Sequence, residues 1–116
     1  MARKRVVVTG LGMLSPVGSN VISSWKRIIE GSSGVKIIDK FDTSDFETKF
    51  AATVDINPED YLDKKEIRRT DPFIQYGLIA SKECLDDSKV DLANIDLNRF
   101  GVSIGSGIGG LGTIED

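Results

Sequence analysis

The stretch Arg5–Gly18, RVVVTGLGMLSPVG, decides the fold class. Its consecutive β-branched residues, Val6 to Val8, predict a strand that is covered on both faces. We expect this strand to run from residue 3 to residue 11, and we expect Gly10 and Gly12 to let the backbone turn sharply away from it. A buried strand that ends in a glycine turn is typical of layered α/β proteins.

A dinucleotide-binding turn is the first interpretation of this stretch, and two residues argue against it. The fingerprint G-x-G-x-x-G would place its third glycine at position 15, which is Ser15. Pro16 lacks a backbone donor at the point where the first turn of the following helix would form. The alternative is a nucleotide-dependent reductase that uses Gly10 and Gly12 to bind its cofactor. A binding assay that finds no cofactor bound would exclude this alternative.

The composition is that of an ordinary globular protein. The 116 residues are 40% hydrophobic and 28% charged, and the net charge of −3 argues against a general nucleic-acid binder. The apolar run behind the basic N-terminus is too short for a signal sequence or a membrane span, so we expect a cytoplasmic protein. Cys84 is the only cysteine in the sequence, and the sequence contains no histidine. These counts exclude an internal disulfide, a histidine general base and a histidine metal ligand within this sequence.

The rest of the pattern alternates short strands with helices, which indicates an α/β fold with a mixed sheet and a long buried helix. The expected elements are, in order, a strand over 3–11, a helix between Asn20 as N-cap and Gly31 as its end, short strands over 35–38 and 49–54, a helical turn over 58–63, a long helix over 73–85 capped by Thr70, and a strand over 100–105.

The long helix predicts that more chain is needed to cover it. Phe73, Tyr76, Ala80 and Cys84 lie on one stripe, while a second apolar stripe contains Leu78. The few other elements offer little cover for a helix of this kind. We therefore expect a piece of a larger protein, and the resemblance described next implies that it is the N-terminal piece of an enzyme. The alternative is a complete small domain that buries the helix by oligomerising.

Four stretches, in this order and spacing, resemble the β-ketoacyl-acyl-carrier-protein synthases, and among them the type II elongation enzymes. They cover almost the whole chain. They are Arg5–Gly18, Phe41–Ser44 with Lys49–Ala51, Lys65–Arg68 running into Asp71–Gly77, and the glycine-rich segment Gly105–Gly112.

The resemblance implies a thiolase-like fold, of which residues 1–116 are the truncated first half. It implies a Claisen condensation in fatty-acid elongation, without metal or nucleotide, by a homodimer. In that reaction a cysteine carries the acyl chain, and two histidines assist the attack of decarboxylated malonyl-acyl carrier protein. This sequence has no histidine, and Cys84 is not at the position of the family's nucleophile. We therefore expect the chain to be inactive alone, with Cys84 packing as a small hydrophobe.

The resemblance also implies two binding features. It places a docking patch for the acidic acyl carrier protein on Lys65, Arg68 and Arg69, whose spacing puts them on one side of a helical turn. The competing interpretation is a solvated basic face. It places Ile108 at the acyl-chain pocket, where a side chain would limit chain length by steric exclusion. A module that only binds carrier protein is the alternative function. The acidic residues near position 86 are expected to be solvated and to bind no metal.

Overall fold

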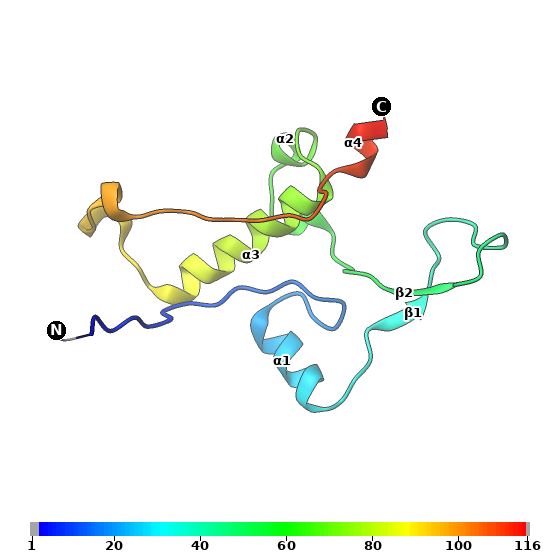
Figure 1. The fold of residues 1–116 in the computed structure, drawn as a ribbon, viewed down its shortest axis with the longest axis horizontal. Helices are drawn as coiled ribbons and strands as arrows, with labels where there is room; N and C mark the ends of the chain where they lie inside the picture. Colours follow the sequence, from blue (N-terminus) through cyan, green and yellow to red (C-terminus); the bar gives the residue numbers. More distant parts are fainter. Residues whose placement is uncertain (1–2, 116) are drawn as a thin grey trace. The chain divides into compact units, whose positions relative to one another are not determined.

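The computed structural model describes residues 3–115. These residues form two compact units, one made of 3–12 with 58–115 and the other of 13–57. Figure 1 labels the helices α1 (Val21–Ile29), α2 (Lys64–Ile67), α3 (Pro72–Ser88) and α4 (Leu111–Glu115), and the strands β1 (Val35–Ile37) and β2 (Phe50–Ala52). Single 3₁₀ turns lie at Pro58–Asp60, Leu92–Asn94 and Leu97–Arg99.

The unit of residues 13–57 begins with a tight turn that leads into α1. Ser15 and Gly18 exchange both backbone hydrogen bonds, at 2.9 and 3.1 Å. Asn20 is the N-cap, as expected, and forms a capping box: its side chain accepts from the Ser23 amide at 2.8 Å, and the Ser23 hydroxyl accepts from the Asn20 amide. The helix ends before Gly31, whose φ of 70° confirms the predicted glycine stop.

The strands β1 and β2 form an antiparallel pair in the same unit. Lys36 lies opposite Ala51, and the Ile38 amide extends the ladder to the Lys49 carbonyl at 3.0 Å. Both short strands were predicted. Within residues 3–115, however, the sheet has only these two strands, so the expected mixed sheet is not formed by this part of the chain.

The long helix α3 is present over Pro72–Ser88 and extends beyond both ends of the predicted range 73–85. Its N-cap is Asp71 and not Thr70, and Pro72 occupies the first helical position. Proline pushes the residue before it into the extended conformation of an N-cap, and Asp71 has φ −68° and ψ 157°. The Gln75 amide group donates to the carbonyls of Ile67 and Thr70 and so joins α3 to the end of α2.

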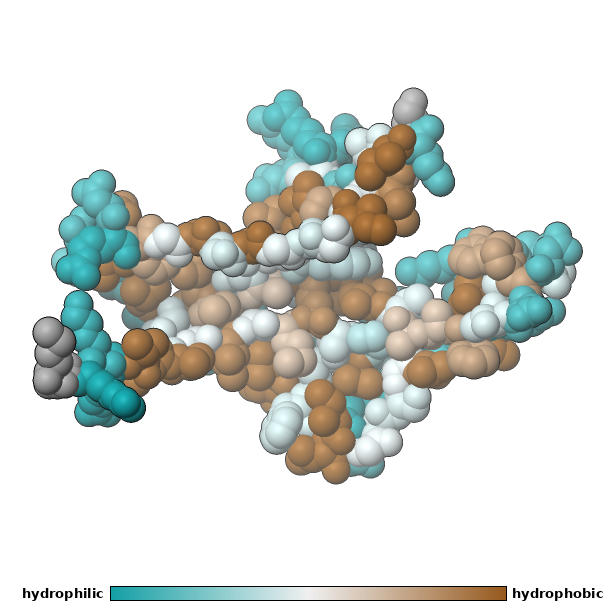
Figure 2. All heavy atoms as spheres, viewed as in Figure 1, coloured by the Kyte–Doolittle hydropathy of each residue, from teal (hydrophilic) through white to brown (hydrophobic). Residues whose placement is uncertain are grey.

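The expected deep burial of α3 is not found. Its buried residues are Gln75 and Ile79, each 6% exposed, while Phe73 and Leu78 stay about two-fifths exposed. Hydrophobic residues lie at the surface over much of the face shown in Figure 2. The described chain thus leaves both apolar stripes of α3 partly open, at Phe73 on one and at Leu78 on the other.

The strands expected over 3–11 and 100–105 are extended but carry no strand pairing. Their apolar side chains are exposed, with Val6 at 93% and Val102 at 79%. A β-ladder needs a neighbouring strand for its N–H and C=O groups. Neither segment has such a neighbour among residues 3–115, so this part of the prediction is wrong for the described chain.

Candidate functional site

The basic cluster predicted to dock a partner is ordered by a single helical turn. The Asp63 carboxylate caps α2 by accepting from the amides of Lys65 and Glu66 at 2.8 and 2.9 Å. Arg68 keeps helical dihedral angles of −70° and −15°, and the Arg69 amide donates to the Glu66 carbonyl at 3.1 Å. The structure therefore brings the three predicted cations onto one turn.

The charges of this cluster are available to a partner. Lys65, Arg68 and Arg69 are exposed, and none of them forms an ion pair within the described residues. The neighbouring Lys64 is different, because its ammonium lies 3.6 Å from the Glu59 carboxylate. A shallow cavity of about 250 Å³ borders Arg68, Arg69 and Thr113.

The glycine-rich segment passes the first turns of α3. Gly109 has φ 86°, in the region that glycine adopts freely, and a Cβ there would lie 3.1 Å from the Phe73 ring. An apolar cavity of about 370 Å³ lies between α3 and residues 104–106, with Phe73, Tyr76, Leu78 and Ile104 in its wall. Ile108 is 73% exposed and is not part of that wall, so its predicted role at an acyl pocket stays a prediction.

Gly10 and Gly12 have a role that the sequence did not reveal. Neither has a positive φ, so they are not needed for a sharp turn, and that prediction is wrong. They let the N-terminal segment lie directly on the backbone of α3 (Figure 1). A Cβ on Gly12 would lie 2.8 Å from the Cys84 nitrogen, and one on Gly10 would lie 2.6 Å from the Ser88 nitrogen. Glycines two apart beside a helix rich in small residues were the available signal.

Cys84 takes part in this contact. Its thiol is partly buried and donates to the Gly10 carbonyl at 3.4 Å, while the Leu11 amide donates to the Asp87 carboxylate at 2.9 Å. These two bonds fasten the segment to the C-terminal half of α3. The thiol therefore has a packing environment, as the sequence predicted.

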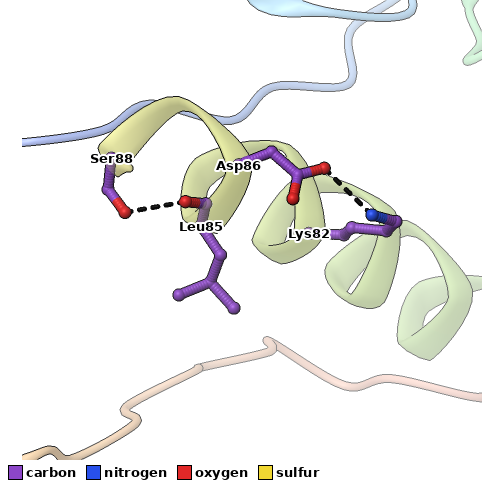
Figure 3. A network of polar contacts seen from close by, with 4 residues as sticks. All are labelled: Lys82, Leu85, Asp86 and Ser88. Carbon is purple, nitrogen blue, oxygen red and sulfur yellow. Dashed lines mark hydrogen bonds and ion pairs between the residues drawn. The ribbon is translucent and has the colours of Figure 1, made fainter. Parts of the chain in front are cut away.

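The other acidic residues at the end of α3 have local partners. Asp86 pairs with Lys82 at 2.9 Å, one turn away, and the Ser88 hydroxyl donates to the Leu85 carbonyl at 2.7 Å (Figure 3). Asp91 accepts from the Ala93 amide and caps a 3₁₀ turn.

Residues 3–115 hold no group of three acidic, cysteine or histidine side chains placed to bind a metal ion. None of the described helices is both long and apolar enough for a membrane crossing.

The family follows from comparison with known proteins. The model of the beta-ketoacyl synthase N-terminal domain matches residues 3–116. The chain belongs to the β-ketoacyl synthase family. A synthase named 3-oxoacyl-[acyl-carrier-protein] synthase 2 from Vibrio harveyi is 52% identical over 116 residues, and its counterpart from Staphylococcus aureus strain N315 is 42% identical over 113 residues.

These relatives are much longer than this β-ketoacyl synthase chain. The match covers 99% of the chain but 28% of the Vibrio harveyi protein, and 97% of the chain but 27% of the Staphylococcus aureus protein. Among solved structures, the ishigamide ketosynthase/chain length factor aligns with a TM-score of 0.72 and 29% identity. That alignment covers 81% of this chain and 24% of the solved one. The predicted fold class, the opening part of a thiolase-like α/β fold, is confirmed.

Proposed function

We propose that this chain is the N-terminal part of a 3-oxoacyl-acyl-carrier-protein synthase that elongates fatty acids. One observation carries the proposal: 52% identity across 99% of the chain to a protein of that name. In the reaction, a cysteine thiolate first takes the acyl group as a thioester. Malonyl-carrier protein then loses carbon dioxide, and the freed electron pair attacks the thioester carbonyl. A carbon–carbon bond forms, and the cysteine leaves again as thiolate.

The chain by itself does not supply the groups for this chemistry. It contains no histidine, and its one thiol donates to the Gly10 carbonyl on the flank of α3. We infer that the nucleophile and the oxyanion donors come from the remainder of a longer polypeptide, which acts as a homodimer. Residues 1–116 then form the incomplete first part of its ketosynthase domain.

The direct test is a condensation assay with the longer polypeptide that contains this chain. We expect acyl- and malonyl-carrier protein to give 3-oxoacyl-carrier protein and one carbon dioxide per condensation. The isolated 116-residue chain, assayed beside it, should release none. A longer polypeptide that binds both substrates without condensing them would overturn the proposal.

We propose that Lys65, Arg68 and Arg69 form the docking patch for acyl carrier protein. Three features support it: the side chains are exposed, they share one turn, and they lack internal ion-pair partners among residues 3–115. In a chain of net charge −3, such a cluster creates a local positive field. Complementary charge of this kind steers association and raises its rate.

Charge reversal tests the patch in the longer enzyme. Lys65→Glu with Arg68→Glu should raise the KM for acyl-carrier protein by about 3- to 10-fold at low ionic strength, and the effect should shrink as salt screens the charges. The matched control, Lys26→Glu with Lys40→Glu, makes the same change in net charge at exposed positions outside the patch. An unchanged KM at low salt, or an equal rise in the control, would assign the cluster to a solvated face.

The second candidate function is a carrier-protein-binding module without catalysis. The same exposed cluster, in a chain without histidine, favours it. Direct titration of the 116-residue chain with acyl carrier protein separates the two. Salt-sensitive binding that the double reversal abolishes supports the module, whereas no binding by a folded chain removes it.

We also propose that Ile108 borders the acyl-chain pocket. Its side chain is 73% exposed, and the preceding Gly107 has open space around it among the described residues. A bulkier residue there would shorten the acyl chain that fits. Ile108→Phe in the longer enzyme should therefore shift activity toward short acyl chains, and an unchanged chain-length profile would refute the role.

A further inference from the structure

A side-chain hydrogen bond joins the end of the glycine-rich segment to the start of α3. The Thr113 hydroxyl lies 2.7 and 2.9 Å from the two carboxylate oxygens of Asp71, 42 residues earlier in the chain. Asp71 is the N-cap of α3, yet its side chain makes no capping hydrogen bond to the helix. The carboxylate is therefore free to serve Thr113, in a hydrogen bond to a charged acceptor, which is stronger than a neutral one.

The backbone beside this contact is shaped to fit it. At Gly110 a Cβ would lie 2.6 Å from the Asp71 carboxyl carbon, so a larger residue there would displace the Asp71 side chain from its present position. Gly109, with φ 86°, lies against the Phe73 ring. Residues 109–113 are thus seated on the first turn of α3.

Among the described residues, no neighbour of this kind lies against Gly105 or Gly107 in the preceding half of the segment. A Cβ on Gly105 or Gly107 would meet no atom within 4 Å. Ile108 stands between this half and Gly109, the left-handed residue at the edge of the seated half. The described structure therefore seats residues 109–113 on α3 and leaves open space beside Gly105 and Gly107, and we expect the position of Ile108 to depend on how firmly the seated part is held.

We propose that Asp71 and Thr113 are positioning residues that set the resting place of Ile108 and, through it, the length of acyl chain that the enzyme accepts. This inference rests on the proposed condensing function and on the proposed place of Ile108. Their effect is indirect, because the Asp71 carboxylate and the Thr113 hydroxyl contact each other. When the hydrogen bond is lost, the segment gains freedom about Gly109, and Ile108 no longer presents one fixed obstacle to the acyl chain. Discrimination between chain lengths should then weaken.

Substitutions at Thr113 test this in the longer enzyme. Thr113→Val removes the hydroxyl and keeps the shape. We expect the ratio of kcat/KM for short and long acyl-carrier proteins to move toward unity by about 3- to 10-fold, because solvent exposure reduces this hydrogen bond to the contribution of an ordinary one. Thr113→Ser keeps the hydroxyl and should restore the ratio. Thr48→Val, at an exposed threonine outside the segment, is the matched control and should leave it unchanged.

Two further measurements separate positioning from a general loss of structure or of docking. Thr113 borders the same cavity as Arg68 and Arg69 of the proposed docking patch, so an effect on docking would change the KM for malonyl-carrier protein. A positioning role predicts that this KM does not change. Amide hydrogen exchange of Leu111 and Ile114, which donate to the carbonyls of Gly109 and Gly110, should quicken in Thr113→Val, while exchange within α3 should not.

Each outcome then has one meaning. A condensing enzyme whose chain-length ratio is the same in Thr113→Val and in the wild type overturns the positioning role and leaves the proposed function standing. Unchanged exchange at Leu111 and Ile114 overturns the anchor itself, whatever the activity. A wild-type enzyme without condensing activity overturns the proposed function, and the chain-length role with it.

Discussion

Alanine substitutions at two glycines should have opposite effects on stability. A Cβ at Gly12 would lie 2.8 Å from the Cys84 nitrogen and 2.9 Å from the Ala80 carbonyl carbon, and would collide with that carbonyl's oxygen. These neighbours belong to the α3 backbone and cannot rotate away. The N-terminal segment must therefore separate from the helix, and we expect Gly12→Ala to lower the free energy of unfolding by about 1–3 kcal/mol.

Gly77 is the matched control, because it lies within α3 and a Cβ there would meet nothing within 4 Å. Alanine at a helix interior is favoured over glycine by about 0.5–1 kcal/mol, so Gly77→Ala should stabilise the chain. The two variants should then differ by about 1.5–4 kcal/mol.

Urea unfolding followed by far-ultraviolet circular dichroism measures both variants at one pH and one protein concentration. Gly12→Ala should also weaken the Cys84–Gly10 contact, so the Cys84 thiol should react faster with a thiol reagent. If Gly12→Ala unfolds at the same urea concentration as the wild type, the close packing on α3 is not real. If both variants lose equal stability, the effect belongs to glycine replacement in general.

Two other predictions concern the unit of residues 13–57. Asn20→Ala should lower the free energy of unfolding by about 1 kcal/mol because it removes the capping box with Ser23. Asn20→Asp should retain most of that stability. Thermal unfolding followed by the helical circular dichroism signal measures both variants. The hydrogen bond between Lys36 and Asp55 lowers the pKa of Asp55 below 3.8 and raises the pKa of Lys36 above 10.5. The stability that Asp55 contributes should therefore be present above pH 3.8 and fade as the pH falls through its lowered pKa. The stability that Lys36 contributes should be present below pH 10.5 and fade as the pH rises through its raised pKa. If Asp55→Asn keeps both the acidic and the alkaline loss of stability seen in the wild type, this interpretation is wrong.

Much of the local structure could be predicted because its causes lie within a few residues. Asn20 and Gly31 bound α1 through capping and a left-handed stop, both of which are properties of single residues next to a helix. The grouping of Lys65, Arg68 and Arg69 on one turn follows from helical spacing alone. The error at Thr70 was also local, since the effect of Pro72 on the residue before it points to Asp71.

The remaining errors concern contacts between distant parts of the chain. The β-branched run Val6–Val8 and the alternating Val102 and Ile104 predict strands, but pairing depends on a neighbouring strand that residues 3–115 do not provide. Burial of α3 fails for the same reason, since an apolar stripe is buried only when another element covers it.

The sequence by itself determined the family, the helix limits of α1, the β1–β2 pair and the cluster of three exposed cations, because motifs, caps and short-range spacing are written in consecutive residues. Only the tertiary structure decided that Gly10 and Gly12 serve close packing on α3, and that Asp71 holds Thr113 across 42 residues. The physical reason is that a glycine or an aspartate has several possible uses. The atoms that the fold brings opposite it select one of them.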